Sequence, residues 1–153
     1  MGFDSSEEFH RFLLAALVGF VAALFCAALW GIVAGITGYK IGLLALGFGY
    51  IIGYSMLAIG QGRSILYGIM GSGFAFFAIV FGNLFSFAVV LANNVELVEQ
   101  FGATTTLGAF GMLLSCPGAL MIIMQSTLHP MELLFYGIAL YTGFTSSFHR
   151  ESE

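Results

Sequence analysis

Charged side chains are the scarcest component of this 153-residue chain. Only 8% of its residues are Asp, Glu, Lys or Arg, whereas soluble proteins carry roughly 25%. Four basic and eight acidic residues give a formal net charge of −4. So few charges cannot cover the surface of an ordinary water-soluble domain. The sequence has no basic patch or stripe either, so it gives no support to nucleic-acid binding.

Cysteine is rare, and the patterns of catalytic sites are missing. The two cysteines, Cys26 and Cys116, lie in separate apolar stretches and match no CxxC or zinc spacing. We interpret both as small buried residues. The three histidines form no recognisable pair with a nucleophile, and no glycine-rich nucleotide motif follows a predicted strand. We therefore expect a protein that is not an enzyme and that holds no cofactor or metal.

Long apolar runs are what the chain has instead. Hydrophobic residues make up 59% of the sequence, and a helix of about 20 such residues crosses a bilayer core of ~30 Å. The runs that reach or approach this length are 12–36, 41–59, 64–92 and 130–148. We expect an all-α polytopic membrane protein in which residues 1–153 form a single integral membrane domain.

A fifth apolar segment, residues 107–125, is interrupted by Pro117 and Gly118. It fits a kinked span, a re-entrant helix pair or a helix that lies in the membrane interface. Re-entrant backbone is tolerated only where protein or water covers it. The sequence therefore predicts four transmembrane helices, and five if this segment crosses.

The basic residues favour four spans over five. Loops rich in Lys and Arg tend to stay on the cytoplasmic side. With four spans, all three arginines share one side of the membrane and Lys40 faces the other. With five spans, the four basic residues are divided two against two. The arginines are Arg11, Arg63 and Arg150. We therefore expect both termini in the cytoplasm.

Glycine accounts for 21 of the 153 residues, about twice its usual share. Small residues lie three or four positions apart, and so on one face of the second predicted span, at Gly42, Ala45, Gly49 and Gly53. The first span ends with a GxxxG pair made by Gly31 and Gly35. Small side chains let membrane helices approach closely, and the turn between these spans is short. We expect the two small faces to meet in a tight antiparallel hairpin; the alternative is that the glycines line a narrow pore or a substrate groove.

Two polar residues within the apolar runs are candidates for a functional site. Asn83 either makes a hydrogen bond between helices or coordinates a permeant species. Glu132 follows Pro130 near the start of a predicted helix, where the helix dipole and the lipid headgroups both favour a carboxylate. Ionisable groups within spans also mark proton or ion pathways and partners. Glu132 therefore fits a structural role, proton or cation handling, or pairing with a basic group of another subunit.

Soft metal ligands gather in the second half of the chain, at Met112, Cys116, Met121, Met124, His129 and Met131. Thioether and thiolate ligands suit Cu(I). Methionine is also ordinary filler in apolar segments, and we favour that interpretation.

The aromatic residues divide by position. Trp30, Tyr39 and Tyr67 lie near the predicted span ends, where aromatic side chains anchor helices at the interface. Tyr50 and Tyr54 flank Gly53, and we expect them to pack, each with a hydroxyl that needs a partner.

One tract of the sequence resembles a known group. It reads Thr37-Gly-Tyr-Lys-Ile-Gly, then Ala45-Leu-Gly-Phe-Gly-Tyr-Ile-Ile-Gly, then the turn Gly60-Gln-Gly-Arg. The tract resembles a loosely defined group of small, uncharacterised bacterial multi-span membrane proteins. The segment that starts at Pro130 resembles the last span of that group, in which the acidic position is commonly Asp and is Glu132 here. The resemblance implies a bacterial source and a shared hairpin, and it brings no activity or catalytic residue.

These features together favour a non-catalytic role. We expect a small subunit of the bacterial inner membrane that packs against other integral membrane proteins, or against itself, and stabilises a larger assembly. The alternative is an oligomeric channel or small transporter with a path lined by Asn83, Glu132 and the broken segment 107–125. Broken helices at membrane depth are typical of transporters.

Overall fold

The chain is seen here in a computed structural model, which describes residues 6–38, 42–60, 64–94, 105–115 and 130–147 together with residues 99, 118, 121 and 125. All regular secondary structure in these residues is helical. The helices are α1 (Ser6–Thr37), α2 (Gly42–Gly60), α3 (Ile65–Asn93), α5 (Thr106–Ser115) and α7 (Pro130–Ser146). The predicted all-α fold is therefore confirmed for the described part of the chain.

Local sequence explains where α1 ends and where α3 begins. Gly38, directly after α1, has a φ of 68°, a left-handed conformation that glycine adopts without a Cβ clash. Its N–H donates to the Ala34 carbonyl at 3.0 Å, which closes the last turn. At the start of α3, the Ser64 hydroxyl accepts a hydrogen bond from the Leu66 N–H at 3.3 Å and caps the helix.

α1 begins at Ser6, earlier than the predicted span at residue 12. The apolar pattern alone misses these first turns because they carry charge. Glu7 and Glu8 lie in the first turn, where carboxylates interact favourably with the positive end of the helix dipole. The helix therefore extends beyond its own apolar run.

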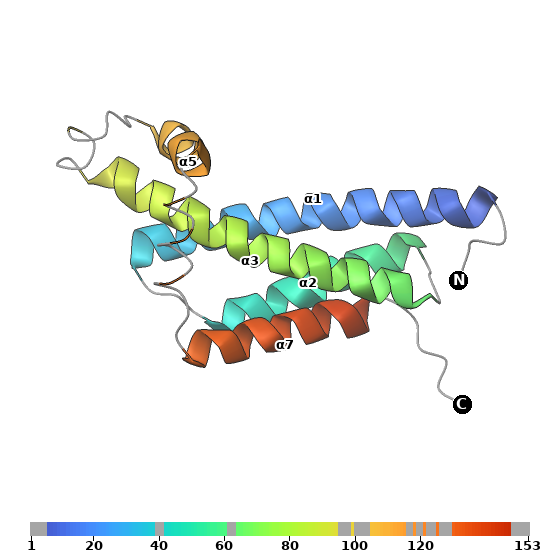
Figure 1. Cartoon of the computed structure of the whole chain (residues 1–153). Coiled ribbons are helices and arrows are strands. Elements are labelled where there is room, and N and C mark those ends of the chain that lie inside the picture. Colours follow the sequence, from blue (N-terminus) through green and yellow to red (C-terminus); the bar gives the residue numbers. More distant parts are fainter. Residues whose placement is uncertain are drawn as a thin grey trace.

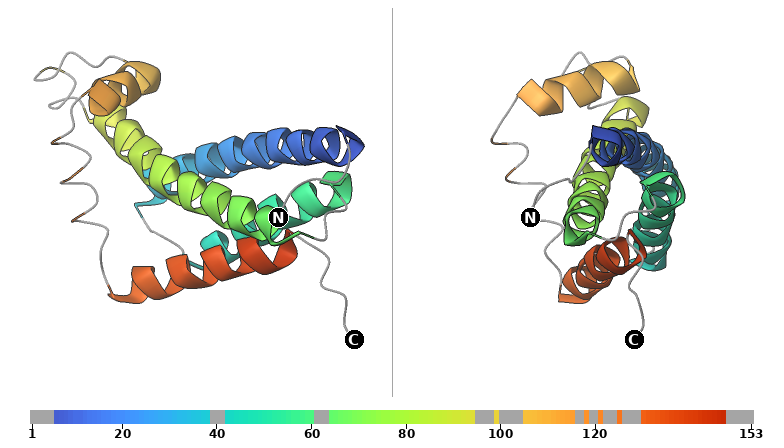
Figure 2. Two further views of the ribbon diagram at one scale, coloured as in Figure 1. Left: turned by 45° about the vertical axis from the view of Figure 1, so that its right-hand side comes forward. Right: turned by 90° about the vertical axis from the view of Figure 1, so that its right-hand side faces the viewer.

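Four helices lie side by side, and α5 packs across the C-terminal end of α3 (Figures 1 and 2). α1 and α7 each contact both α2 and α3. Consecutive helices of this bundle run antiparallel, whereas α1 runs parallel to α3 and α2 runs parallel to α7 (Figure 1). As a result, α1 begins and α7 ends at the same end of the bundle.

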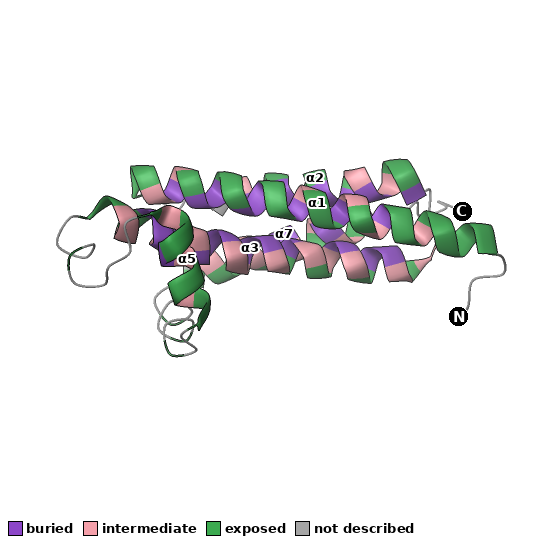
Figure 3. Ribbon diagram, turned by 90° about the horizontal axis from the view of Figure 1, so that it is seen from above, coloured by how far each residue is buried: buried purple, intermediate pink, exposed green. Residues whose placement is uncertain are grey.

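The interior consists mainly of small residues and the outside of large apolar ones. Figure 3 shows which parts of each helix are buried and which are exposed. More than half of the described buried apolar residues are alanine. The large side chains exposed on α1 include Leu13, Leu14, Leu17, Val21, Leu24, Phe25, Ile32 and Ile36. This arrangement is the reverse of a water-soluble domain, which places its large aliphatic residues inside.

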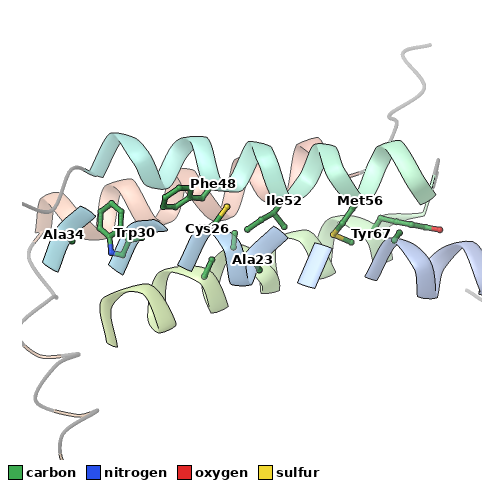
Figure 4. Close-up of a cluster of buried hydrophobic side chains, with 11 residues drawn as sticks. Ala23, Cys26, Trp30, Ala34, Phe48, Ile52, Met56 and Tyr67 are labelled. Carbon is green, nitrogen blue, oxygen red and sulfur yellow. The ribbon is translucent and has the colours of Figure 1, made fainter. Parts of the chain in front are cut away.

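The main core cluster fills the space between α1, α2 and α3 (Figure 4). Its larger members are Cys26, Trp30, Phe48, Ile52, Met56 and Tyr67. Trp30 is 3% exposed and Tyr67 is 4% exposed, so the expectation that they anchor the bundle at a membrane interface is wrong. Both side chains occupy the bundle interior instead. Tyr39 lies outside the described residues.

The glycine faces of α1 and α2 do not meet each other. A Cβ added at Gly31 would clash with Phe85, and one added at Gly35 would clash with Val89. Both of those residues belong to α3. The expected hairpin of two small faces is therefore wrong in its partners, although α1 and α2 are antiparallel neighbours as predicted. The physical reason is that α2 turns its large side chains, Phe48 and Met56 among them, toward α1.

The small face of α2 packs against α7. A Cβ at Gly49 would clash with the Ala139 carbonyl and the Thr142 hydroxyl, and one at Gly53 would clash with Ser146. Ala45 lies in a small cluster with Ile79 and Ala139. The surroundings of Gly42 are not described. The glycines of the two helices thus permit two separate close approaches, α1 to α3 and α2 to α7.

Two of the helices, α1 and α3, are long and apolar enough to cross a membrane. α2 has 19 residues and α7 has 17, and they coincide with the runs predicted at 41–59 and 130–148. Within the broken segment 107–125, α5 ends at Ser115. The residues that follow lie mostly outside the described part of the chain.

Candidate functional site

α3 carries Asn83 into the bundle, where its side chain is buried at 5% exposure. The Asn83 carbonyl oxygen Oδ1 accepts a hydrogen bond from Trp30 Nε1 at 3.1 Å. The amide nitrogen Nδ2 donates to the hydroxyl of Tyr136 at 3.1 Å. One side chain of α3 therefore links α1 to α7.

The chain of hydrogen bonds continues along α7. The Tyr136 hydroxyl donates to Glu132 Oε2 at 3.3 Å, one turn closer to the helix start. Glu132 is half-buried in the first turn of α7. We call the four residues Trp30, Asn83, Tyr136 and Glu132 the polar chain.

Close packing positions the inner end of the polar chain. A Cβ at position 82 would lie 2.6 Å from Trp30 Cδ1, so only glycine lets the indole lie against the backbone of α3. Phe48 of α2 meets the same indole edge-on, with ring centroids 6.0 Å apart at 87°. The indole is therefore held by three helices at once.

Apolar side chains surround the middle of the polar chain. Tyr136 packs against a buried cluster made by Ala45, Ile79 and Ala139. Hydrogen bonds are electrostatically stronger in such a low-dielectric setting, and an unpaired polar group is correspondingly costly. In the described residues, every buried side-chain nitrogen and oxygen has a hydrogen-bond partner.

The polar chain has a fixed direction. An indole N–H can only donate, so Asn83 must turn its carbonyl oxygen toward Trp30 and its NH₂ group toward Tyr136. Each following donor then points toward the carboxylate of Glu132. Because the indole of Trp30 accepts no proton, the polar chain ends at Trp30.

Asn83 and Glu132, the two polar candidates from the sequence, thus belong to one network. They do not touch each other, because Tyr136 lies between them. Sequence reasoning missed Tyr136, although its position four residues after Glu132 places both on one face of α7. It also misplaced Trp30, which follows Cys26 by four residues on the small face of α1.

Four of the six soft metal ligands have no described side chain, so the structure does not test the copper interpretation. Among the described residues, no group of three His, Cys, Asp or Glu side chains could hold a metal ion. Met112 and Met121 are exposed, whereas Cys116, Met124 and His129 lie outside the described part and the side chain of Met131 is not described. The copper interpretation gains no support.

The chain matches no protein-family model, no curated protein and no solved structure in the comparisons made. The resemblance to small bacterial membrane proteins therefore stays a prediction.

Proposed function

We propose that this protein is a non-catalytic integral membrane subunit that packs against another membrane protein and stabilises the assembly. In this proposal α1, α2, α3 and α7 cross the bilayer and α5 lies at its surface. Bacterial inner membrane is the proposed location, with both termini in the cytoplasm.

The outward face of the bundle supports membrane insertion. Only 28% of the most apolar stretch of α1 is buried, which is less than the core helix of a soluble fold buries. Large apolar side chains are exposed on the other helices as well, such as Ile51, Ile69 and Leu134. Apolar patches on soluble monomers rarely exceed a few hundred Å², whereas acyl chains cover such a surface readily.

Helix lengths favour four crossings. At 1.5 Å per residue, α2 is about 28 Å long and α7 about 25 Å, close to the ~30 Å of a bilayer core. α2 lies beside both α1 and α3, and α7 lies beside α3; α1 and α3 are longer. α5 is only about 15 Å long and lies across the end of α3 (Figure 2), so it fits the interface better than a crossing.

The polar chain is the observation that carries the non-catalytic role. The interior hydrogen-bonding groups of Trp30, Asn83 and Tyr136 are engaged with one another. Polar groups used in this way join membrane helices. A catalytic or transport site requires polar groups that are available to a ligand.

Purification from native membranes tests the proposal. The tagged chain is solubilised in mild detergent, and the proteins that accompany it are quantified by mass spectrometry. We expect a stoichiometric set of larger membrane proteins. Recovery of this chain alone, as a homo-oligomer, would contradict the subunit role.

A channel or small transporter is the second candidate, and one observation favours it. Asn83 and Glu132 are linked through Tyr136, as residues along a path would be. If such a path exists, Glu132→Gln changes ion flux in proteoliposomes. Absence of flux with both the wild type and this variant would count against the channel.

A further inference from the structure

α3 and α7 are joined near both of their ends, so the extents of these two helices can be compared directly. Near one end, Asn83 of α3 hydrogen-bonds to Tyr136 of α7 at 3.1 Å. Near the other end, a Cβ at Gly71 of α3 would clash with Ser147 and with the Gly143 carbonyl. We call the second end, where α1 begins and α7 ends (Figure 1), the terminal end of the bundle, and the first its loop end.

At the loop end, α7 becomes polar before the apolar surface of α3 stops. Glu132 lies about 6 Å beyond Tyr136 along the helix axis, and its carboxylate accepts the Tyr136 hydroxyl at 3.3 Å. α3 continues about 10 Å beyond Asn83 to Val90, which is 44% exposed. A flat bilayer edge that covers Val90 would bury the Glu132 carboxylate in hydrocarbon, which is costly for an ionisable group.

At the terminal end, α7 again stops first. Its last residue, Ser146, lies beside the contact with Gly71. α3 extends about 9 Å past Gly71 to Ile65, which is 44% exposed. α1 also reaches past this level, because Phe12 packs edge-on against Tyr67 of α3, one turn beyond Gly71. α7 is therefore set back from its neighbours at both ends.

A tilt of the bundle cannot correct a helix that is set back at both ends, because it improves the fit at one end and worsens it at the other. α3 spans about 37 Å from Ile65 to Val90 and can shorten its projection by tilting; α1 and α3 are inclined to each other (Figure 2). α7 spans only about 21 Å from Glu132 to Ser146, and tilting would shorten it further. A helix that is too short for the bilayer is accommodated by thinning of the bilayer.

Lipid is the neighbour that fits the outer face of α7 next to Glu132. The exposed side chains there, Leu134 and Ile138, are hydrocarbon only. We propose that the bilayer is locally thinned beside α7 and that its edge at the loop end is drawn in to the level of Glu132. The acyl chains in contact with α7 are then shorter or more disordered than those beside α1 and α3. This inference rests on the proposed function, because it requires α7 to cross the membrane.

The depth of spin labels in vesicles tests the inference. The full chain, with both native cysteines replaced by alanine, is reconstituted in dioleoylphosphatidylcholine. One new cysteine carries a nitroxide, through Leu134→Cys or Thr145→Cys on α7, or through Ile32→Cys or Val21→Cys on α1 as matched controls. All four positions are exposed. Positions 134 and 32 lie about 3 Å from the polar chain toward the loop end, and positions 145 and 21 about 14 Å from it toward the terminal end.

Collision rates with oxygen, which concentrates in hydrocarbon, and with a water-soluble nickel chelate report the depth of each label. Averaged over the two pairs, we expect the α7 labels to lie about 5 Å shallower than the α1 labels, half of the shortfall of α7 against a bilayer core of ~30 Å. A tilt or an axial offset moves the two pairs in opposite directions and leaves the average unchanged. An average difference near zero, or α7 labels that neither reagent reaches because protein covers them, would overturn the inference.

Two variants test whether Glu132 sets the edge at the loop end. Glu132→Leu extends the apolar surface of α7 to its start, so the label at position 134 should lie deeper. Glu132→Gln keeps a polar side chain of the same length and is the matched control, which should leave the label at its original depth. Equal depths of this label in the two variants would overturn the inference.

The same labels separate this inference from the proposed function. If the nickel chelate reaches all four positions as freely as it reaches a label in water, the helices are not inserted. That result refutes the proposed membrane subunit, and the inference falls with it. Labels that lie in hydrocarbon at the same average depth on α7 and α1 refute the local thinning alone.

Discussion

At the scale of single residues, the bundle is organised around Asn83. A buried amide is tolerated only when its donor and acceptor groups are both engaged. Trp30 supplies the donor for its oxygen, and Tyr136 supplies the acceptor for its nitrogen. Because these partners come from α1 and α7, one side chain fixes how both helices sit against α3.

Removal of one hydroxyl tests the polar chain. Tyr136→Phe leaves the Asn83 amide without its acceptor and should lower the free energy of unfolding by about 1 kcal/mol. Tyr141→Phe is the matched control, since it removes an exposed hydroxyl from the same helix. Chemical unfolding of the isolated protein in mixed micelles measures both. Equal effects of the two substitutions would mean that the polar chain does not stabilise the bundle.

Sequence reasoning found part of this site and missed the rest for a physical reason. Asn83 and Glu132 were recognisable because polar groups are costly inside apolar runs. Tyr136 and Trp30 were not, since amphipathic aromatic residues fit both a membrane interface and a buried hydrogen bond. Whether such a side chain faces the membrane interface or the bundle interior depends on how its helix is rotated about its own axis.

At the scale of elements, glycine determines which helices approach closely. Advancing four residues from Gly31 to Gly35 moves the contact on α3 from Phe85 to Val89, which shows the parallel packing of these two helices. The sequence predicted the helices and their approximate ends well. It did not predict the partner of each glycine face, because short turns fix which helices are neighbours and not which sides meet.

A pair of glycines in α3 tests close packing at the α3–α7 contact. A Cβ at Gly71 would clash with the Ser147 hydroxyl and the Gly143 carbonyl, whereas one at Gly73 would meet nothing within 4 Å. Gly71→Ala should therefore destabilise the bundle by forcing α7 away. Gly73→Ala should be neutral or stabilising by up to about 1 kcal/mol, the helix-propensity gain. Thermal unfolding in micelles distinguishes them, and equal stability changes would contradict this packing.

At the scale of the whole molecule, the bundle has small residues inside and large apolar residues outside. This arrangement suits a helical bundle surrounded by lipid. Composition alone predicted a helical membrane protein. The antiparallel order of the four bundle helices, with α5 across one end (Figure 1), favours the four-span topology over five. The number of membrane crossings decides on which sides the two chain ends lie. An even number of crossings returns the chain to the side on which it started, so four spans place both ends on one side.

Accessibility of the two termini therefore tests the central claim most directly. Epitope tags at residues 1 and 153 are probed with antibody in intact and permeabilised spheroplasts. The four-span account predicts that both tags are shielded in intact cells and become accessible together after permeabilisation. Accessibility of one tag alone in intact cells would show an odd number of crossings and contradict the account.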